Sequence, residues 1–212
     1  MVEAQHVAST MKIVDDADEQ MLLEALLDAS KPPLANATAG LDYLLASPFR
    51  YPPRHGGSRF RDANAPGVFY GAQHVRTACA ELGYWRWKFL HDAVDLARIE
   101  PVAHTAFSVD VATPAVDLRA PPFDRDAAVW MNPSNYAPCQ AFAAVAREAE
   151  VGGIVYQSVR DPRKAWCLAV LTPTAFAKRK PNAEKQTWWL AVAQDKVVWR
   201  RNEQSFVFAQ GA

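Results

Sequence analysis

The chain has 212 residues, half of them apolar, and its 23 Lys and Arg residues balance its 23 Asp and Glu residues. This length can bury the core of one ordinary domain. The neutral charge argues against nonspecific nucleic-acid binding but does not exclude a local basic groove. The cysteines at positions 79, 139 and 167 are far apart. They predict free thiols in a reducing compartment, with no disulfide framework or zinc site.

Two helices are predicted before the first loop-rich segment. DEQMLLEALLDAS (18–30) has acidic residues in its first turn and KPP as its stop, which is typical of a short helix. LDYLLA (41–46) predicts one or two further helical turns. Prolines and glycines punctuate 47–67, which we expect to be a loop. VFYG (68–71) then predicts a short buried strand.

The longest helical candidate is 73–99, and a second helix is predicted over 137–151, ended by Gly152 and Gly153. Strands are predicted at 104–111, 153–159 and 165–171, followed by a hairpin formed by TWWLAVA and KVVWRRN. Helices dominate the first two thirds and strands the last third, which indicates an α+β fold. No GxGxxG or GxxxxGK[ST] motif supports a Rossmann or P-loop fold.

No segment approaches the length of a membrane span, and the first sixteen residues contain no apolar core of a signal peptide. We therefore expect a cytoplasmic protein that does not attach to membranes. The histidines at positions 74, 91 and 104 show no metal-ligand spacing, so no metal is expected. KRKPNAEK (178–185) is interpreted as a solvated loop rather than as a nucleic-acid patch.

Four short motifs carry the candidate chemistry: GSRF (57–60), PGVFYGA (66–72), TACAE (77–81) and GIVYQSVR (153–160). Tyr70 follows Arg59 by eleven residues, and Glu81 follows Tyr70 by eleven. In the fourth motif, alternation along a strand places Tyr156 and Ser158 on one face. A serine at the end of such a face can point its hydroxyl into a cleft.

In order and spacing these motifs resemble the RES-domain family, which includes the toxins of bacterial toxin–antitoxin pairs and is named for an Arg, a Glu and a Ser. The resemblance divides the chain into an N-terminal helical extension, 1–44, and a catalytic domain, 45–212. It implies a fold similar to ADP-ribosyltransferases, with a split, twisted β-sheet and helices around an NAD cleft. It also implies that Arg59, Tyr70, Glu81 and Ser158 are the catalytic residues.

The resemblance further implies what the protein consumes and what it binds. Family members use NAD as a substrate. Some degrade it by hydrolysis or phosphorolysis, and some transfer ADP-ribose to a protein. The expected partner is an antitoxin with a helix-turn-helix DNA-binding part that blocks the site. A toxin of this kind inhibits growth and has no direct contact with nucleic acid.

The residue types suit this chemistry. Cleaving the nicotinamide–ribose bond builds positive charge on the ribose, which the Glu81 carboxylate would stabilise. An arginine fork suits the pyrophosphate or a ribose hydroxyl, with Arg59 first and Arg50 second. Tyr70 can stack on the nicotinamide, and Ser158 can hydrogen-bond the ribose or the amide. The predicted NAD-binding set is Arg50, Tyr51, Arg59, Tyr70 and Ser158.

Several alternatives stay open from the sequence alone. Arg61 is either solvated or the arginine that acts in place of Arg59. Glu81, placed among apolar neighbours, is either half-buried for function or paired with a neighbour such as Lys88. The N-terminal extension favours protein modification over NAD breakdown. The alternative to an enzyme is a non-catalytic nucleotide-binding module that acts through its partner, and the presence of all four catalytic candidates argues against it.

Overall fold

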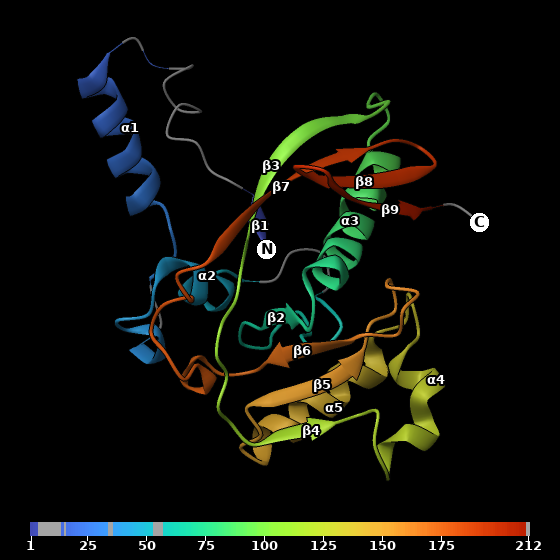
Figure 1. Ribbon diagram of the computed structural model, residues 1–212. Coiled ribbons are helices and arrows are strands. Elements are labelled where there is room, and N and C mark those ends of the chain that lie inside the picture. Colours follow the sequence, from blue (N-terminus) through green and yellow to red (C-terminus); the bar gives the residue numbers. More distant parts are fainter. Residues whose placement is uncertain (4–13, 15, 34–35, 53–56, 211–212) are drawn as a thin grey trace.

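The computed structural model describes residues 1–3, 14, 16–33, 36–52 and 57–210 (Figure 1). It is a mixture of helices and strands, which confirms the predicted α+β class. The α-helices are α1 (Ala17–Ala29), α2 (Tyr43–Arg50), α3 (Val75–Asp92), α4 (Ala127–Trp130) and α5 (Ala137–Glu148). Short 3₁₀ turns are η2 (Asn36–Thr38), η3 (Phe123–Asp126) and η4 (Pro173–Ala175).

The strands of the described residues form two separate sheets. The five-stranded sheet has the order β1-β3-β7-β8-β9 and is antiparallel throughout. Its strands are β1 (Val2–Glu3), β3 (Ile99–Phe107), β7 (Lys185–Val192), β8 (Lys196–Arg201) and β9 (Gln204–Ala209). The four-stranded sheet has the order β2-β6-β5-β4, with β4 and β5 parallel. Its strands are β2 (Phe69–Ala72), β4 (Ala115–Asp117), β5 (Gly153–Gln157) and β6 (Trp166–Val170).

Helix α3 connects the two sheets and packs closely on the five-stranded one. A Cβ added at Gly83 would lie 2.7 Å from Cγ1 of Val197, so only glycine permits this approach of α3 to β8. The indole Nε1 of Trp199 donates to the carbonyl of Cys79 at 3.0 Å. The buried core of this half contains Trp188, Leu190, Val197 and Trp199. This face of α3 is therefore fixed on the sheet, which leaves its other face for the four-stranded half of the molecule.

Both faces of the four-stranded sheet are covered. Because side chains alternate along β6, Cys167 and Ala169 pack in the core on the α5 side, whereas Leu168 and Val170 join the opposite core. On the first side, α5 lies behind β5 (Figure 1). On the second side, α2 contributes Leu45 and Phe49, η4 contributes Ala175, and Phe176 follows η4 directly. The sheet is thus a rigid base for residues at its edges.

Most predicted elements are present, with corrections at their ends. Helix α3 ends at Asp92 and not at residue 99, and α5 ends at Glu148. Glu150, with φ of 57°, takes the left-handed position there, and the amide of Val151 donates to the carbonyl of Ala146. Gly152 has another role: a Cβ there would lie 2.0 Å from Oγ1 of Thr113.

The N-terminal region contributes a strand and a helix. Strand β1 pairs with β3, so residues 2–3 belong to the five-stranded sheet. Helix α1 confirms the helix predicted for 18–30 and stands apart from both sheets at the upper left of Figure 1. It exposes Met21, Leu22, Leu26 and Leu27. None of the helices in the described part of the chain combines the length and apolar character needed to cross a bilayer.

Candidate active site

The centre of the candidate site is a direct contact between Glu81 and Ser158. Glu81 lies on the face of α3 that turns away from the five-stranded sheet, and Ser158 follows β5 directly. The Ser158 hydroxyl donates to Oε1 of Glu81 at 2.6 Å. Ser158 is 2% exposed and Glu81 is half-buried. A buried hydroxyl therefore orients a carboxylate that is still partly accessible.

Two further contacts, one before and one after Glu81 along α3, fix the segment 158–161 to this helix. One helical turn before Glu81, the buried hydroxyl of Thr77 donates to Oδ2 of Asp161 at 2.8 Å. One turn after it, the Arg160 guanidinium lies 3.4 Å from the ring centroid of Tyr84. The spacing of 77, 81 and 84 is that of one helix face. We call these three contacts the α3 ladder.

The backbone of the same segment also fixes the Ser158 hydroxyl. The amide of Asp161 donates to the Ser158 hydroxyl oxygen at 3.0 Å, and the amide of Arg160 does so at 3.3 Å. The hydroxyl oxygen thus accepts hydrogen bonds from two backbone amides, and its O–H group donates a hydrogen bond to Glu81. Because both sides of the hydroxyl are engaged, its orientation is fixed.

Tyr156 lies behind the pair on the α5 side of the sheet. It is 6% exposed and opposes Cys167 in the register of β5 and β6. Burial raises its pKa well above the ordinary value, and electrostatic interactions with Cys167, Glu81 and Tyr70 act in the same direction. Arg59 opposes them. The Tyr156 hydroxyl is therefore neutral and lies within electrostatic reach of three predicted catalytic residues.

Tyr70 is held through its hydroxyl. The hydroxyl forms a hydrogen bond with the Ser58 side chain at 2.8 Å and accepts from the amide of Phe60 at 3.0 Å. Burial of this hydroxyl raises its pKa, although these hydrogen bonds oppose the shift. The residue as a whole is 37% exposed. Its polar end is thus anchored under the 58–60 segment while part of the side chain faces solvent.

Arg59 is 9% exposed, which is unusual for a loop arginine. Its Nη1 donates to the carbonyls of Trp130 at 2.8 Å and Asn132 at 2.9 Å, and its guanidinium lies 4.6 Å from the ring centroid of Tyr136. Arg59 therefore ties its own segment to the 130–136 segment. The same segment accepts a hydrogen bond from Arg160, whose Nη2 donates to the carbonyl of Pro133 at 2.6 Å.

The other two candidate arginines hold backbone at a distance from the ladder. Arg61 donates to the carbonyls of Ala65 at 3.1 Å and Tyr51 at 2.7 Å. Arg50 donates from Nε to the carbonyl of Pro32 at 2.5 Å, and Tyr51 is 38% exposed. Arg59, Tyr70 and Glu81 interact electrostatically with Tyr156, and Ser158 is connected to them by its hydrogen bond to Glu81. Arg61 adjoins this group through Tyr70, with which it interacts electrostatically, and through Ser58, whose amide donates to the Arg61 carbonyl. The contacts of Arg50 and Tyr51 do not join them to this group.

The alternative pairing of Glu81 with Lys88 is not what the structure shows. Lys88 forms an ion pair with Asp92 at 3.2 Å, at a spacing of four residues on α3. Three contributors were missed in the sequence: Thr77, Asp161 and Cys167. Thr77 shares the helical stripe of Glu81, and Asp161 follows Ser158 by three residues, so helical spacing and a serine turn were the available signals.

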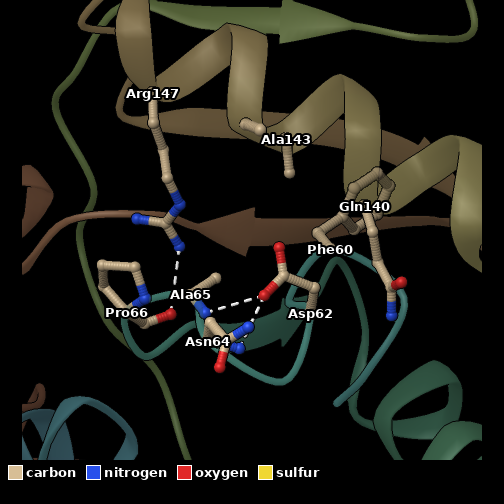
Figure 2. Close-up of a pocket in the computed structure, with 9 residues that line it drawn as sticks. Phe60, Asp62, Asn64, Ala65, Pro66, Gln140, Ala143 and Arg147 are labelled. Carbon is tan, nitrogen blue, oxygen red and sulfur yellow. Dashed lines mark hydrogen bonds between the residues drawn. The ribbon is translucent and has the colours of Figure 1, made fainter. Parts of the chain in front are cut away.

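Two cavities flank this region. The first, of about 280 Å³, lies between α5 and the 60–66 loop (Figure 2). Figure 2 shows Asp62 accepting from the amides of Asn64 and Ala65, and Arg147 reaching the carbonyl of Pro66. Gln140 donates to the carbonyl of Ser58. These hydrogen bonds fix the 58–66 loop on α5. They therefore help to hold Arg59 in position, together with the segment that anchors the Tyr70 hydroxyl.

The second cavity, of about 350 Å³, lies at the start of α3 beside the β5–β6 connection. Thr77 and Asp161 of the ladder form part of its wall, so this cavity adjoins the Glu81–Ser158 pair. Across the described ranges, no group of three or more His, Cys, Asp or Glu side chains is placed to hold a metal ion.

The family model of the RES domain matches residues 33–193. This match takes in α2, α3, all four predicted motifs and β7. The chain therefore belongs to the RES-domain family. A search of the curated proteins finds no significant match to the chain.

Proposed function

We propose that this protein cleaves NAD at the nicotinamide–ribose bond. The observation that carries the proposal is the carboxylate of Glu81, half-buried and oriented by the Ser158 hydroxyl at 2.6 Å. When nicotinamide leaves with the bonding electron pair, positive charge develops on the ribose. A fixed carboxylate beside that ribose stabilises the charge without reorganising during the reaction.

The other residues would act on binding and orientation. Tyr70 presents part of its side chain while its hydroxyl is anchored, which suits stacking on the nicotinamide. Arg59 would contact the pyrophosphate or ribose through the part of its guanidinium that does not hold the 130–136 segment. Arg50 and Tyr51 would contribute NAD contacts only after a change in position relative to the group around Tyr156.

The reaction type depends on which nucleophile attacks the ribose after nicotinamide has left. Water gives ADP-ribose, phosphate gives ADP-ribose 1″-phosphate, and a side chain gives an ADP-ribosylated protein. The test is incubation of the purified chain with labelled NAD, with and without a bacterial lysate. Released nicotinamide supports the proposal, and the labelled product identifies the acceptor. Folded protein that releases no nicotinamide and labels no protein would show a binding module without turnover.

We further propose that the protein is a cytoplasmic toxin held inactive by an antitoxin with a helix-turn-helix DNA-binding part. The support is membership of the RES-domain family. Expression without the partner should arrest bacterial growth, because NAD is drained or an essential protein is modified. Expression of the Glu81→Gln variant at the same soluble level is the control. Equal growth of both cultures would contradict the toxin role.

A further inference from the structure

The cavity at the start of α3 has an excess of basic side chains. His74 and Arg76 reach it from the α3 side, and Arg163 and Lys164 from the β5–β6 connection. Arg163 and Lys164 are exposed at its rim. With a volume of about 350 Å³, it falls within the size range of small-ligand sites. Two elements distant in sequence thus bring positive charge to one concave surface.

The carboxylate in this cavity offsets only one of the three positive charges of Arg76, Arg163 and Lys164, and its oxygens are held by other groups of the fold. Asp161 is 3% exposed; its Oδ2 accepts from Thr77 at 2.8 Å and its Oδ1 from the amide of Arg163 at 3.1 Å. Arg76 lies 3.8 Å from Oδ1. The side chains of Arg163 and Lys164 therefore add positive charge beyond the Arg76–Asp161 pair.

Arg76 has a hydrogen-bonding capacity that the described residues leave unused. Its side chain is 16% exposed, and its guanidinium lies 4.6 Å from the ring centroid of Phe208. Its Nε is buried and contacts no acceptor in the described part of the chain. An unsatisfied buried donor on a cation is costly. Arg76 also lines the cavity, so an oxyanion bound there would supply opposite charge to its guanidinium.

We propose that this cavity is a binding site for a phosphate group, supplied either as a free inorganic anion or as part of a nucleotide. Thr77 lines it, and Glu81 lies one helical turn further on the same face of α3, so the bound phosphate would lie next to the Glu81–Ser158 pair. The site rests on charge and shape and not on any reaction. It can therefore exist whether or not the protein cleaves NAD.

The test is calorimetric titration of the full chain with inorganic pyrophosphate, inorganic phosphate and ADP-ribose at constant ionic strength. The Arg163→Gln/Lys164→Gln variant should bind pyrophosphate about tenfold more weakly than the wild type. The control, Lys185→Gln/Arg200→Gln, removes the same two charge types from exposed positions of β7 and β8. It should bind like the wild type.

The outcomes separate the two sources and the competing explanations. Loss of phosphate and pyrophosphate binding in the cavity variant supports a site for the free anion. Loss confined to ADP-ribose supports a site for a nucleotide phosphate. No binding of any of the three probes to folded wild-type protein, or equal weakening in the control, overturns the proposal. Anion binding that persists without NAD cleavage would contradict the proposed function and leave this site standing.

Discussion

The Ser158 hydroxyl and the Glu81 carboxylate form a 2.6 Å hydrogen bond between residues 77 positions apart in the chain. The contact joins the end of β5 in the four-stranded sheet to α3, which packs on the five-stranded sheet. The two halves of the molecule therefore meet at the candidate catalytic carboxylate. A change in how α3 sits on either sheet would move this carboxylate.

Glu81→Gln should lower turnover by roughly 10²–10³ while leaving NAD binding much less affected. Glutamine keeps an oxygen that accepts from Ser158 but lacks the charge that stabilises the ribose. Steady-state kinetics and NAD calorimetry measure the two effects, with circular dichroism to check the fold. Glu100→Gln, at an exposed position, is the control. Near-normal turnover in folded Glu81→Gln would mean that Glu81 is a structural helix residue.

Arg59→Ala should weaken NAD binding and also slow the reaction, because an arginine on the pyrophosphate or ribose contacts substrate and transition state alike. It should also lower the free energy of unfolding by about 3 kcal/mol, since two backbone carbonyls lose a charged donor. Urea unfolding and NAD calorimetry measure the two effects. Arg125→Ala, an exposed arginine, should change neither. Unchanged NAD affinity in folded Arg59→Ala would restrict Arg59 to holding the 130–136 segment.

Thr77→Val should destabilise the fold by about 1–3 kcal/mol. Valine keeps the shape of threonine but removes the donor to the buried Asp161 carboxylate. Thr187→Val, on an exposed position of β7, is the matched control and should stay within about 0.5 kcal/mol of the wild type. Urea unfolding measures the change in the free energy of unfolding for each variant. Equal effects in the two variants would show that the Thr77–Asp161 contact contributes nothing to stability.

The sequence predicted the elements that carry Glu81 and Ser158 better than it predicted the contacts between these residues. Spacing placed Glu81 on a helix and Ser158 at a strand end, and the structure agrees. Their pairing depends on which face of α3 turns to the five-stranded sheet. That choice is made by the close approach at Gly83 and the Trp199 bond to Cys79, which are contacts between distant segments. Helical spacing alone therefore left Lys88 as an equal candidate partner.

Turns account for two further differences between the predicted and the observed elements. Strand β9 was not predicted, because the chain reverses at Asn202, where φ is 52°, without the glycine that marks a tight hairpin. Helix α5 likewise ends next to Glu150, which adopts a left-handed conformation. Gly152 is required for a different reason, because a Cβ there would clash with Thr113 on a neighbouring segment. After α5 the local composition points to a glycine as the breaker although Glu150 takes the left-handed position, and in the hairpin Asn202 takes that position where the sequence has no glycine.

The stability of the fold should fall as the pH rises from about 9 to about 11, and the buried thiols should account for part of this fall. Burial raises the pKa of Cys79 and of Cys167 to about 12, and the Glu81 charge adds to the shift of Cys167. In the unfolded chain these thiols ionise near their ordinary pKa of 9.0. Above that pH the unfolded state therefore binds fewer protons than the folded state, and unfolding becomes easier.

Each thiol should contribute a slope of about 1.4 kcal/mol per pH unit within this window and nothing well below it. The measurement is urea unfolding at several pH values for the wild type and for Cys79→Ala/Cys167→Ala. The variant should start from a lower stability, because small cavities replace two sulfur atoms, but its stability should fall less steeply. Tyrosine and lysine ionisation acts on both proteins alike and cancels in the comparison. Parallel pH profiles would show that these thiols do not stay protonated in the folded state to the pH that their burial implies.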